Sequence, residues 1–330
     1  MLAGLWSLVA VFAAPALAAD KIRIGYLPLT SHAPTFIAQA KGYFTAQELE
    51  VELVSFQAAE PMAVAIASGD VDFGITAITG GLISLADKGV VKVIGGALEE
   101  APGITGEKIL AAKPAYDQGL KTPGQLKGHS FGITTTGSSF HYMAHKIAEK
   151  EGLAEADLKP VPLHHVAAVA ASLKTGQIDS WSIQPSIADT LVKGGTVVEI
   201  GKISDYIPHY QVTTVFTSTA NVEKRAEVVK RFLAAYGKGI ADYNTTLVDK
   251  TTPADAAADV VKAIHRYVYA DQPLEKAEPS IRAGAMRISP EAHLNVASVK
   301  DQLDWFKAEK MVPASVTMDK LVNTSFVKTD

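Results

Sequence analysis

Close to the start of the chain, residues 22–26 alternate between apolar and polar or small side chains, and this period of two predicts a half-buried strand. A proline-containing turn follows, and the apolar spacing then changes to that of an amphipathic helix ending near Gly42. The loop between these elements, residues 27–34, carries Ser31 and His32 just before the helix begins. In an open α/β sheet such a loop lies at the carboxyl end of a strand, where ligands bind, so we expect it to form part of a binding site.

The same unit of strand, hydroxyl-rich loop, helix and glycine recurs at residues 131–152. An offset of 107 residues joins several pairs of identical residues: Gly25 and Gly132, Ser31 and Ser138, Gly69 and Gly176, and Asp72 and Asp179. Several matches at one offset predict two lobes of similar architecture. Because the lobes present equivalent loops, we expect a ligand to be held in the cleft between them.

The rest of the chain alternates predicted strands and helices as far as residue 220 and is mostly helical beyond it. Further strands are expected at residues 49–56, 71–75, 90–95, 160–163, 179–183 and 196–200, and further helices at 62–67, 166–174, 222–244, 254–267 and 290–309. Regular spacing fades between residues 97 and 120, and residues 210–218 are extended and β-branched. We expect the chain to cross between the lobes at these two places, first close to residues 108–111, which provides a hinge. The late helices are expected to pack back on the first lobe.

The composition is that of an ordinary globular protein large enough for two domains. Of 330 residues, 48% are hydrophobic and 20% are charged. The net charge of -4 gives no electrostatic footprint for nucleic acid. The chain has no cysteine, which excludes disulfides, thiolate metal sites, thiol nucleophiles and iron–sulfur clusters.

The N-terminal segment predicts export. Residues 1–18 carry no charged side chain, have an apolar run at residues 8–14 and end in Ala-Leu-Ala. This is typical of a secretory signal peptide cleaved near Ala18, although the usual basic residue at its start is missing. The run is shorter than the ~20 residues of a membrane span. Export without a cysteine for lipid attachment predicts a periplasmic protein.

Three phrases of the sequence, IGYLPLTSHAPTFIAQAKGYF, ASGDVDFGITA and LKTGQIDSWSIQPS, resemble the periplasmic solute-binding proteins of nitrate/sulfonate/taurine-type ABC importers. The yeast-type thiamine-pyrimidine synthases share that superfamily. The resemblance covers nearly the whole mature chain. It implies an α/β, two-lobed periplasmic-binding-protein fold of type II, in which two crossover strands form a hinge. The expected segments are a signal peptide at 1–18, lobe 1 at 19–108, lobe 2 at 109–212 and the mostly helical return of lobe 1 at 213–330.

The first lobe has two candidate loops. The expected ligand contacts there are Ser31, His32, Thr76, Ala77 and Ile78. Ser31 could equally cap the helix that follows it. His32 is a good donor to an anion near neutral pH. The residues after the strand predicted at 71–75 could instead lead into a helix that Thr79 caps, and both roles are compatible.

In the second lobe, residues 134–139 (TTTGSS) carry five hydroxyl groups in six positions. An ordinary capped turn explains one hydroxyl but not five. Gly137 lets the backbone approach closely, and Ser138 and Ser139 are expected to cap the next helix with N–H groups directed into the cleft. The expected contacts of this stretch are Thr135, Thr136, Gly137, Ser138 and Ser139. The pattern is neither a nucleophile elbow nor a phosphate-binding loop.

Further candidates are His141 in the first turn of that helix, Trp181 and Gln184 in and after the next strand, and His209 and Tyr210 at the return crossing. His141 and His145 share a helix face and could bind metal, but no HExxH pattern or adjacent carboxylate accompanies them. No metal or cofactor is therefore predicted. Trp181 could belong to the core instead.

None of the candidate loops carries an arginine or lysine, which a dianion or bulky phosphate would usually need. Hydroxyl, amide and imidazole groups suit a monoanion such as a sulfonate or carboxylate, or an uncharged heterocycle, and both stay open. The resemblance implies a monomeric, non-enzymatic protein that delivers its solute to a membrane permease and ATPase. An enzyme on the same fold is the weaker alternative, because the thiamine-pyrimidine synthases carry a cysteine-rich motif and this chain has no cysteine. A regulator's effector-binding domain is a third, but no basic segment or helix-turn-helix pattern precedes it.

Overall fold

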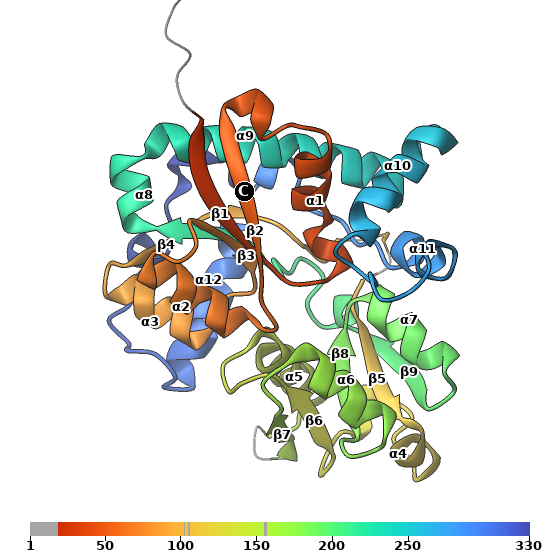
Figure 1. Ribbon diagram of the computed structural model, residues 1–330. Coiled ribbons are helices and arrows are strands. Elements are labelled where there is room, and N and C mark those ends of the chain that lie inside the picture. The colour runs from red at the N-terminus through yellow and green to blue at the C-terminus, as the bar shows by residue number, and fades with distance from the viewer. Residues whose placement is uncertain (1–18, 102, 105, 155–156) are drawn as a thin grey trace, which may run out of the picture.

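The computed structural model describes residues 19–330 except 102, 105 and 155–156, so the predicted signal peptide lies outside the described residues. The chain forms two five-stranded mixed sheets with helices packed against them. In Figure 1 the first sheet lies in the upper part and the second in the lower part. This is the predicted two-lobed α/β fold; "lobe" below means one sheet with its helices.

The two sheets have equivalent strand orders, β2-β1-β3-β10-β4 and β7-β6-β8-β5-β9. In each, the fourth strand runs antiparallel to both neighbours. That strand follows a crossing, so each sheet receives one strand from the chain as it arrives from the other lobe. The strands are β1 (Asp20–Tyr26), β2 (Leu49–Ser55), β3 (Phe73–Thr76), β4 (Val91–Gly96), β5 (Lys108–Ala112), β6 (Ser130–Ile133), β7 (Lys159–Pro162), β8 (Ser180–Ile183), β9 (Val197–Lys202) and β10 (Thr214–Ser218).

The helices follow the strands in the expected order through both lobes. They are α1 (Ala33–Ala40), α2 (Ala59–Ser68), α3 (Gly80–Asp87), α4 (Lys113–Asp117), α5 (Ser139–Glu151), α6 (Val166–Lys174), α7 (Pro185–Lys193), α8 (Thr219–Lys224), α9 (Ala226–Tyr243), α10 (Ala254–His265), α11 (Leu274–Ala283), α12 (Val296–Ala308) and α13 (Met318–Leu321). The helix predicted at 222–244 is broken at Arg225, whose backbone is not helical. The helix predicted at 290–309 begins only at Val296, because Leu294 is extended and bridges Thr329.

Close packing explains why the 107-residue offset pairs Gly25 with Gly132. A Cβ on Gly25 would lie 2.9 Å from Met62 Cγ, and one on Gly132 would lie 2.5 Å from Val169 Cγ1. Met62 and Val169 are themselves 107 residues apart. Helix α2 therefore lies so close to β1, and α6 so close to β6, that only glycine fits at these positions.

The aspartates of the offset also have equivalent structural roles. The backbone N–H of Arg23 donates to Asp72 Oδ2 at 2.8 Å, and that of Ser130 donates to Asp179 Oδ2 at 2.8 Å. Each aspartate thus fastens the start of its own strand to the neighbouring parallel strand, β1 in the first sheet and β6 in the second. These motif residues serve the fold and not the cleft.

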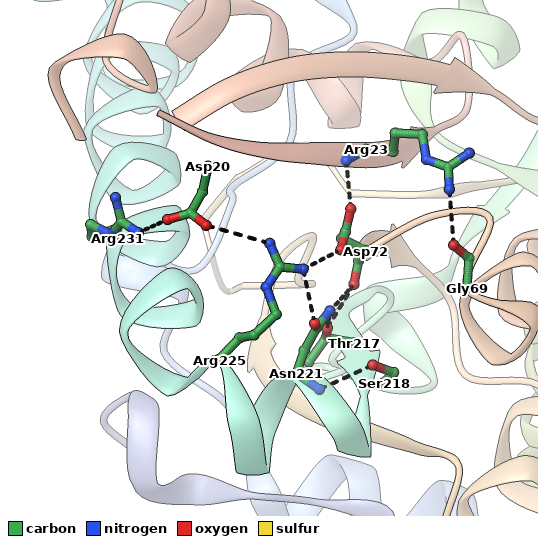
Figure 2. A network of polar contacts seen from close by, with 9 residues as sticks. All are labelled: Asp20, Arg23, Gly69, Asp72, Thr217, Ser218, Asn221, Arg225 and Arg231. Carbon is green, nitrogen blue, oxygen red and sulfur yellow. Dashed lines mark hydrogen bonds and ion pairs between the residues drawn. The ribbon is translucent and has the colours of Figure 1, made fainter. Parts of the chain in front are cut away.

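In the first lobe, Asp72 belongs to a larger polar network at the start of β1 and β3 (Figure 2). Its carboxylate pairs with Arg225 at 2.7 Å, and its carbonyl accepts from Thr217 at 2.6 Å and Asn221 at 3.2 Å. Arg225 also lies 4.0 Å from Asp20. The network ties β1, β3 and β10 to α8, and Arg225 joins it at the point where α8 ends.

We expect Asp72→Ala to lower the free energy of unfolding by about 2–3 kcal/mol, because a charge-assisted backbone hydrogen bond and a partly exposed ion pair are both lost. Urea unfolding measures the change. The matched control is Asp70→Ala, an exposed aspartate two residues away. Equal midpoints for the two variants would show that the network contributes nothing to stability.

The two crossings lie side by side, as a hinge requires. Val212 N donates to Leu98 O at 2.9 Å, and Ala97 N donates to Thr213 O at 3.0 Å. Glu100 N then donates to Tyr210 O at 2.9 Å. This ladder confirms that two crossover segments are paired. The predicted place of the first crossing, close to residues 108–111, is wrong, because these residues form β5 inside the second sheet and the crossing precedes them.

The C-terminal region packs on the first lobe and in addition contacts the second lobe, a contact that the sequence pattern did not predict. Helix α9 packs on α1, but α11 packs on α7 of the second lobe. Trp305 of α12 lies 5.3 Å from the Tyr142 ring of α5, and the Tyr269 hydroxyl donates to Ser186 O at 2.9 Å. Within the described part of the chain, no helix has the length and apolarity to cross a membrane.

Candidate functional site

A narrow cavity of about 50 Å³ lies between the two lobes, at the carboxyl ends of the parallel strands of both sheets. Residues after β1, β3, β6 and β8 line it, together with residues of both crossings. The lobes touch beside it: Gly80 N donates to Gly137 O at 3.1 Å, and Val166 N donates to Gln57 O at 3.4 Å. The structure therefore has the closed arrangement of the two lobes.

About half of the predicted contacts line this cavity, and they come from both lobes. They are Ser31, His32, Thr76, Ala77, Ser138, Ser139 and Gln184. No capping hydrogen bond from Ser31 is found at the 3-10 turn Thr30–His32 or at α1, so the alternative role as a helix cap is wrong. Thr79 does cap α3, since its hydroxyl accepts from Leu82 N at 3.1 Å. Contact of the seven with a solute stays a prediction.

The other predicted contacts lie outside the cavity lining: Ile78, Thr135, Thr136, Gly137, His141, Trp181, His209 and Tyr210. Ile78, Trp181 and Tyr210 are fully buried in the core. His209 and Thr136 are exposed to solvent, and Thr135 is half-buried.

Gly137 and His141 hold the hydroxyl-rich loop in place. Gly137, at φ 74°, brings its backbone close to the other lobe rather than to the cavity, with Phe306 within 3.2 Å of where a Cβ would lie. The N–H of Gly137 donates to His141 Nδ1 at 3.2 Å, and the His141 ring lies edge-on to Trp305. Among the described residues, no group of three or more His, Cys, Asp or Glu side chains could hold a metal ion.

Three cavity-lining side chains have buried polar atoms without a hydrogen-bond partner among the described residues. They are Ser138 Oγ, Glu107 Oε2 and both polar atoms of the Gln184 amide. A buried unpaired polar group costs about 1–3 kcal/mol, so such groups are rare unless they serve a function. Their convergence on one cavity indicates a surface prepared for a hydrogen-bonding ligand.

Ser138 departs from its expected role. It occupies the N-cap position of α5 with extended backbone, yet its side chain makes no capping hydrogen bond. A serine at this position normally caps the helix with its own oxygen. Here the hydroxyl remains available to the cavity, and the predicted side-chain cap is wrong.

His32 is a neutral donor rather than a cationic one. Its Nδ1 accepts from Leu27 N at 3.4 Å, which leaves the proton on Nε2. Burial lowers the pKa of His32 to about 3, because the charged ring would lose its hydration. At neutral pH it can therefore offer a hydrogen bond but no positive charge.

The lowered pKa of His32 predicts a loss of stability in acid. The unfolded chain binds the proton near pH 6.5 but the folded chain only near pH 3, so the free energy of unfolding falls as the pH falls between these values. By pH 4.5 the loss should reach roughly 2–3 kcal/mol. We expect His32→Asn, which keeps an acceptor for Leu27, to remove this part of the slope in urea titrations from pH 7 to pH 4.5. An unchanged slope in the variant would contradict the assignment.

The most consequential residue that the sequence prediction missed is Glu107, in the first crossing. It is buried, lines the cavity, and donates its backbone N–H to Glu100 Oε1 at 2.6 Å. Burial raises the pKa of Glu100 to about 7 and that of Glu107 well above its usual range, and the charge of Glu100 adds to the rise at Glu107. In the sequence, acidic residues stand on both sides of a Pro/Gly-rich crossing. This pattern could have marked them as candidates, but it does not show that they are buried.

None of the described cavity-lining residues is a lysine or arginine. The neighbouring Lys108 is on β5, and its Nζ pairs with Asp189 at 2.6 Å and Glu199 at 2.8 Å. The predicted lack of a cation in the candidate loops therefore extends to the whole described lining. The lining instead contains an acid, Glu107.

A second, aliphatic cavity of about 130 Å³ adjoins the first. Leu27, Leu29 and Val166 line both cavities, and the second is otherwise bounded by residues such as Ala170 and Ile187. A ligand with its polar end at Ser138 and Gln184 could place an apolar part here. The pair of cavities suits a small amphipathic molecule.

A family model and several solved structures match this architecture. The model of the NMT1/THI5-like family matches residues 29–245, which is more than half of the chain. A comparison with curated proteins finds no match.

Solved structures with the same fold include two binding proteins and an enzyme. The alkanesulfonate-binding protein SsuA of Xanthomonas axonopodis pv. citri bound to MOPS is 20% identical, with a TM-score of 0.73 over 94% of this chain and 100% of that one. The periplasmic nitrate-binding protein NrtA of Synechocystis PCC 6803 is 13% identical, with a TM-score of 0.72 over 92% and 86%. The desulfurization enzyme DSZB is 12% identical, with a TM-score of 0.62 over 93% and 97%. At these identities the likeness establishes the periplasmic-binding-protein fold.

Proposed function

The chain belongs to the NMT1/THI5-like family, and on that basis we propose that it is the solute-binding component of an ABC importer, working in the periplasm as a monomer. The observation that carries the proposal is the set of unpaired buried polar atoms of Ser138, Gln184 and Glu107 around one interlobe cavity. The binding proteins with the same fold support it. The proposed lobe boundaries remain 19–108 with 213–330, and 109–212.

In the proposed mechanism, a solute bridges the two walls of the cavity and holds the lobes together. His32 on the first lobe and Ser138 and Gln184 on the second would contact it from opposite sides. Closure shifts the population toward the form that a membrane permease reads. The paired backbone of residues 97–100 and 210–213 would bend as the hinge.

We further propose that the protein is not an enzyme. A catalytic serine needs a base within hydrogen-bond reach, and the Ser138 hydroxyl has no partner among the described residues. The fold itself does not decide the question, because DSZB shares it. The isolated hydroxyl favours binding over catalysis.

Two classes of solute are predicted, a small organic anion and an uncharged or aromatic heterocycle. A thermal-shift screen with alkyl and aryl sulfonates, taurine, nitrate, aromatic carboxylates and heterocycles tests the proposal. A solute at about 100 times its dissociation constant should add about 2.7 kcal/mol of stability, which raises the unfolding midpoint by several degrees. Native mass spectrometry of the purified protein checks for a solute already bound. A protein that carries no solute, and that responds neither to these probes nor to amines and amidines, would contradict the proposed function.

A further inference from the structure

The position of Glu107 restricts the chemistry of the solute. Its carboxyl lines the cavity with only about 4% of the residue exposed, and its Oε2 has no hydrogen-bond partner among the described residues. An isolated buried carboxylate is costly, and it is tolerated when protonated or when paired with a positive charge. Glu107 therefore needs either a proton or a positively charged partner, and the described residues supply no such partner.

The titratable groups around this carboxyl offer no free positive charge to an anionic partner. Lys108, the next residue in the chain, is already paired with Asp189 and Glu199. Glu100 on the same crossing accepts from the Glu107 backbone, and its own Oε2 is unpaired. Tyr210 on the return crossing is fully buried and its hydroxyl is unpaired among the described residues. The charges of both carboxyls add to the effect of burial and raise its pKa. His32 across the cavity is neutral. A sulfonate or carboxylate would meet an acid here and no cation.

The fold keeps the two carboxyls together. A Cβ on Gly106 would lie 1.9 Å from Glu100 Oε2, so only glycine leaves room for that carboxyl beside the chain. Burial raises the pKa of both acids, and none of the described residues that line the cavity is a lysine or arginine that could offset this. The cluster is thus ready to give up a proton when a positive charge arrives.

We propose that the solute is a small basic nitrogen compound, an amine or amidine, whose protonated nitrogen pairs with Glu107 while its apolar part lies in the adjoining aliphatic cavity. The inference rests on the proposed function and specifies its substrate class. Ser138 and Gln184 would accept further N–H bonds from the same head group. The binding reaction releases the Glu107 proton and forms an ion pair in its place.

The test compares matched probes that share an apolar body: benzamidine and benzylamine against benzoate and benzenesulfonate. We expect the two cations to raise the unfolding midpoint and the two anions to leave it unchanged. Glu107→Gln, which keeps the shape of the side chain, should weaken benzamidine binding about 30- to 100-fold. The matched control is Glu99→Gln on the same crossing, whose carboxylate accepts from Ser289 and does not line the cavity; its affinity should stay within about twofold.

A second readout separates charge pairing from a packing effect. Because binding releases a proton, the benzamidine affinity of the parent should rise as the pH rises toward the pKa of Glu107, and Glu107→Gln should abolish this dependence. His32→Asn should leave the dependence in place, which assigns it to Glu107.

Three outcomes overturn the inference. Anions that bind while cations do not, with affinity unaffected or improved by Glu107→Gln, would overturn it and leave the proposed function standing. Cation binding that is insensitive to Glu107→Gln and to pH would place the charge elsewhere. Silence of both cations would exclude the proposed class, and a co-purified anionic solute seen by native mass spectrometry would then show that the function stands without it.

Discussion

Replacing Ser138 by alanine and Gln184 by leucine should weaken solute binding by at least about 100-fold while leaving the unliganded protein as stable as the parent or more so. Both side chains are about 2% exposed and hold polar atoms without partners among the described residues. Removing them takes away hydrogen bonds to the solute and also relieves an existing penalty in the free protein. The leucine keeps the volume of Gln184, so little new cavity is created.

Isothermal titration and urea unfolding of the same preparations measure the two effects. Thr136→Ala is the matched control, because it removes a hydroxyl from the same loop at an exposed position outside the cavity. It should leave affinity and stability within about 0.5 kcal/mol of the parent. Unchanged affinity in the double variant would place the site elsewhere. A large loss of stability would mean that the two side chains serve the fold.

Gln211→Leu should lower the free energy of unfolding by about 3–5 kcal/mol, because several buried groups lose their partner at once. Gln211 is buried in the return crossing, and its Nε2 donates to Leu98 O at 3.2 Å and to Thr213 O at 3.0 Å. Its Oε1 accepts from Asn295 N at 3.1 Å. One side chain thus joins both crossings to the segment that leads into α12.

Chemical unfolding of the purified variant measures this loss. Gln118→Leu is the control, since the same substitution at an exposed site should change stability by no more than about 0.5 kcal/mol. A Gln211→Leu protein with a midpoint like that of Gln118→Leu would show that the backbone ladder alone holds the crossings. An intermediate in the unfolding curve would instead show that the lobes separate before they unfold.

Local pattern was enough to predict most of the two sheets and their helices. Strand alternation, helical spacing and terminal glycines are properties of short segments. The 107-residue offset includes Gly25 and Gly132 because a helix packs equally closely against both positions. The break at Arg225 could not be predicted in this way. At the break, Arg225 pairs with Asp72, which is 153 residues distant in sequence and outside any local pattern.

The candidate site was predictable where loops follow parallel strands, as for Ser31 and Gln184. It was not predictable where a side chain's direction depends on tertiary partners. Trp181 is turned into the core and His141 toward its own loop, although both stand next to lining residues. Glu107 was missed because burial of an acid is set by the meeting of two crossings, which no local pattern records.

The measurement that tests the account most directly is the distance between the lobes with and without solute. The chain has no cysteine, so Val64→Cys on α2 and Lys174→Cys on α6 would carry the only two spin labels. Both positions are exposed, and both helices begin at residues that border the cavity. A solute that raises the unfolding midpoint should move the distance distribution to shorter values, and the Ser138→Ala, Gln184→Leu background should abolish the shift. A solute that binds tightly while the distribution stays the same would contradict closure of the two lobes around it.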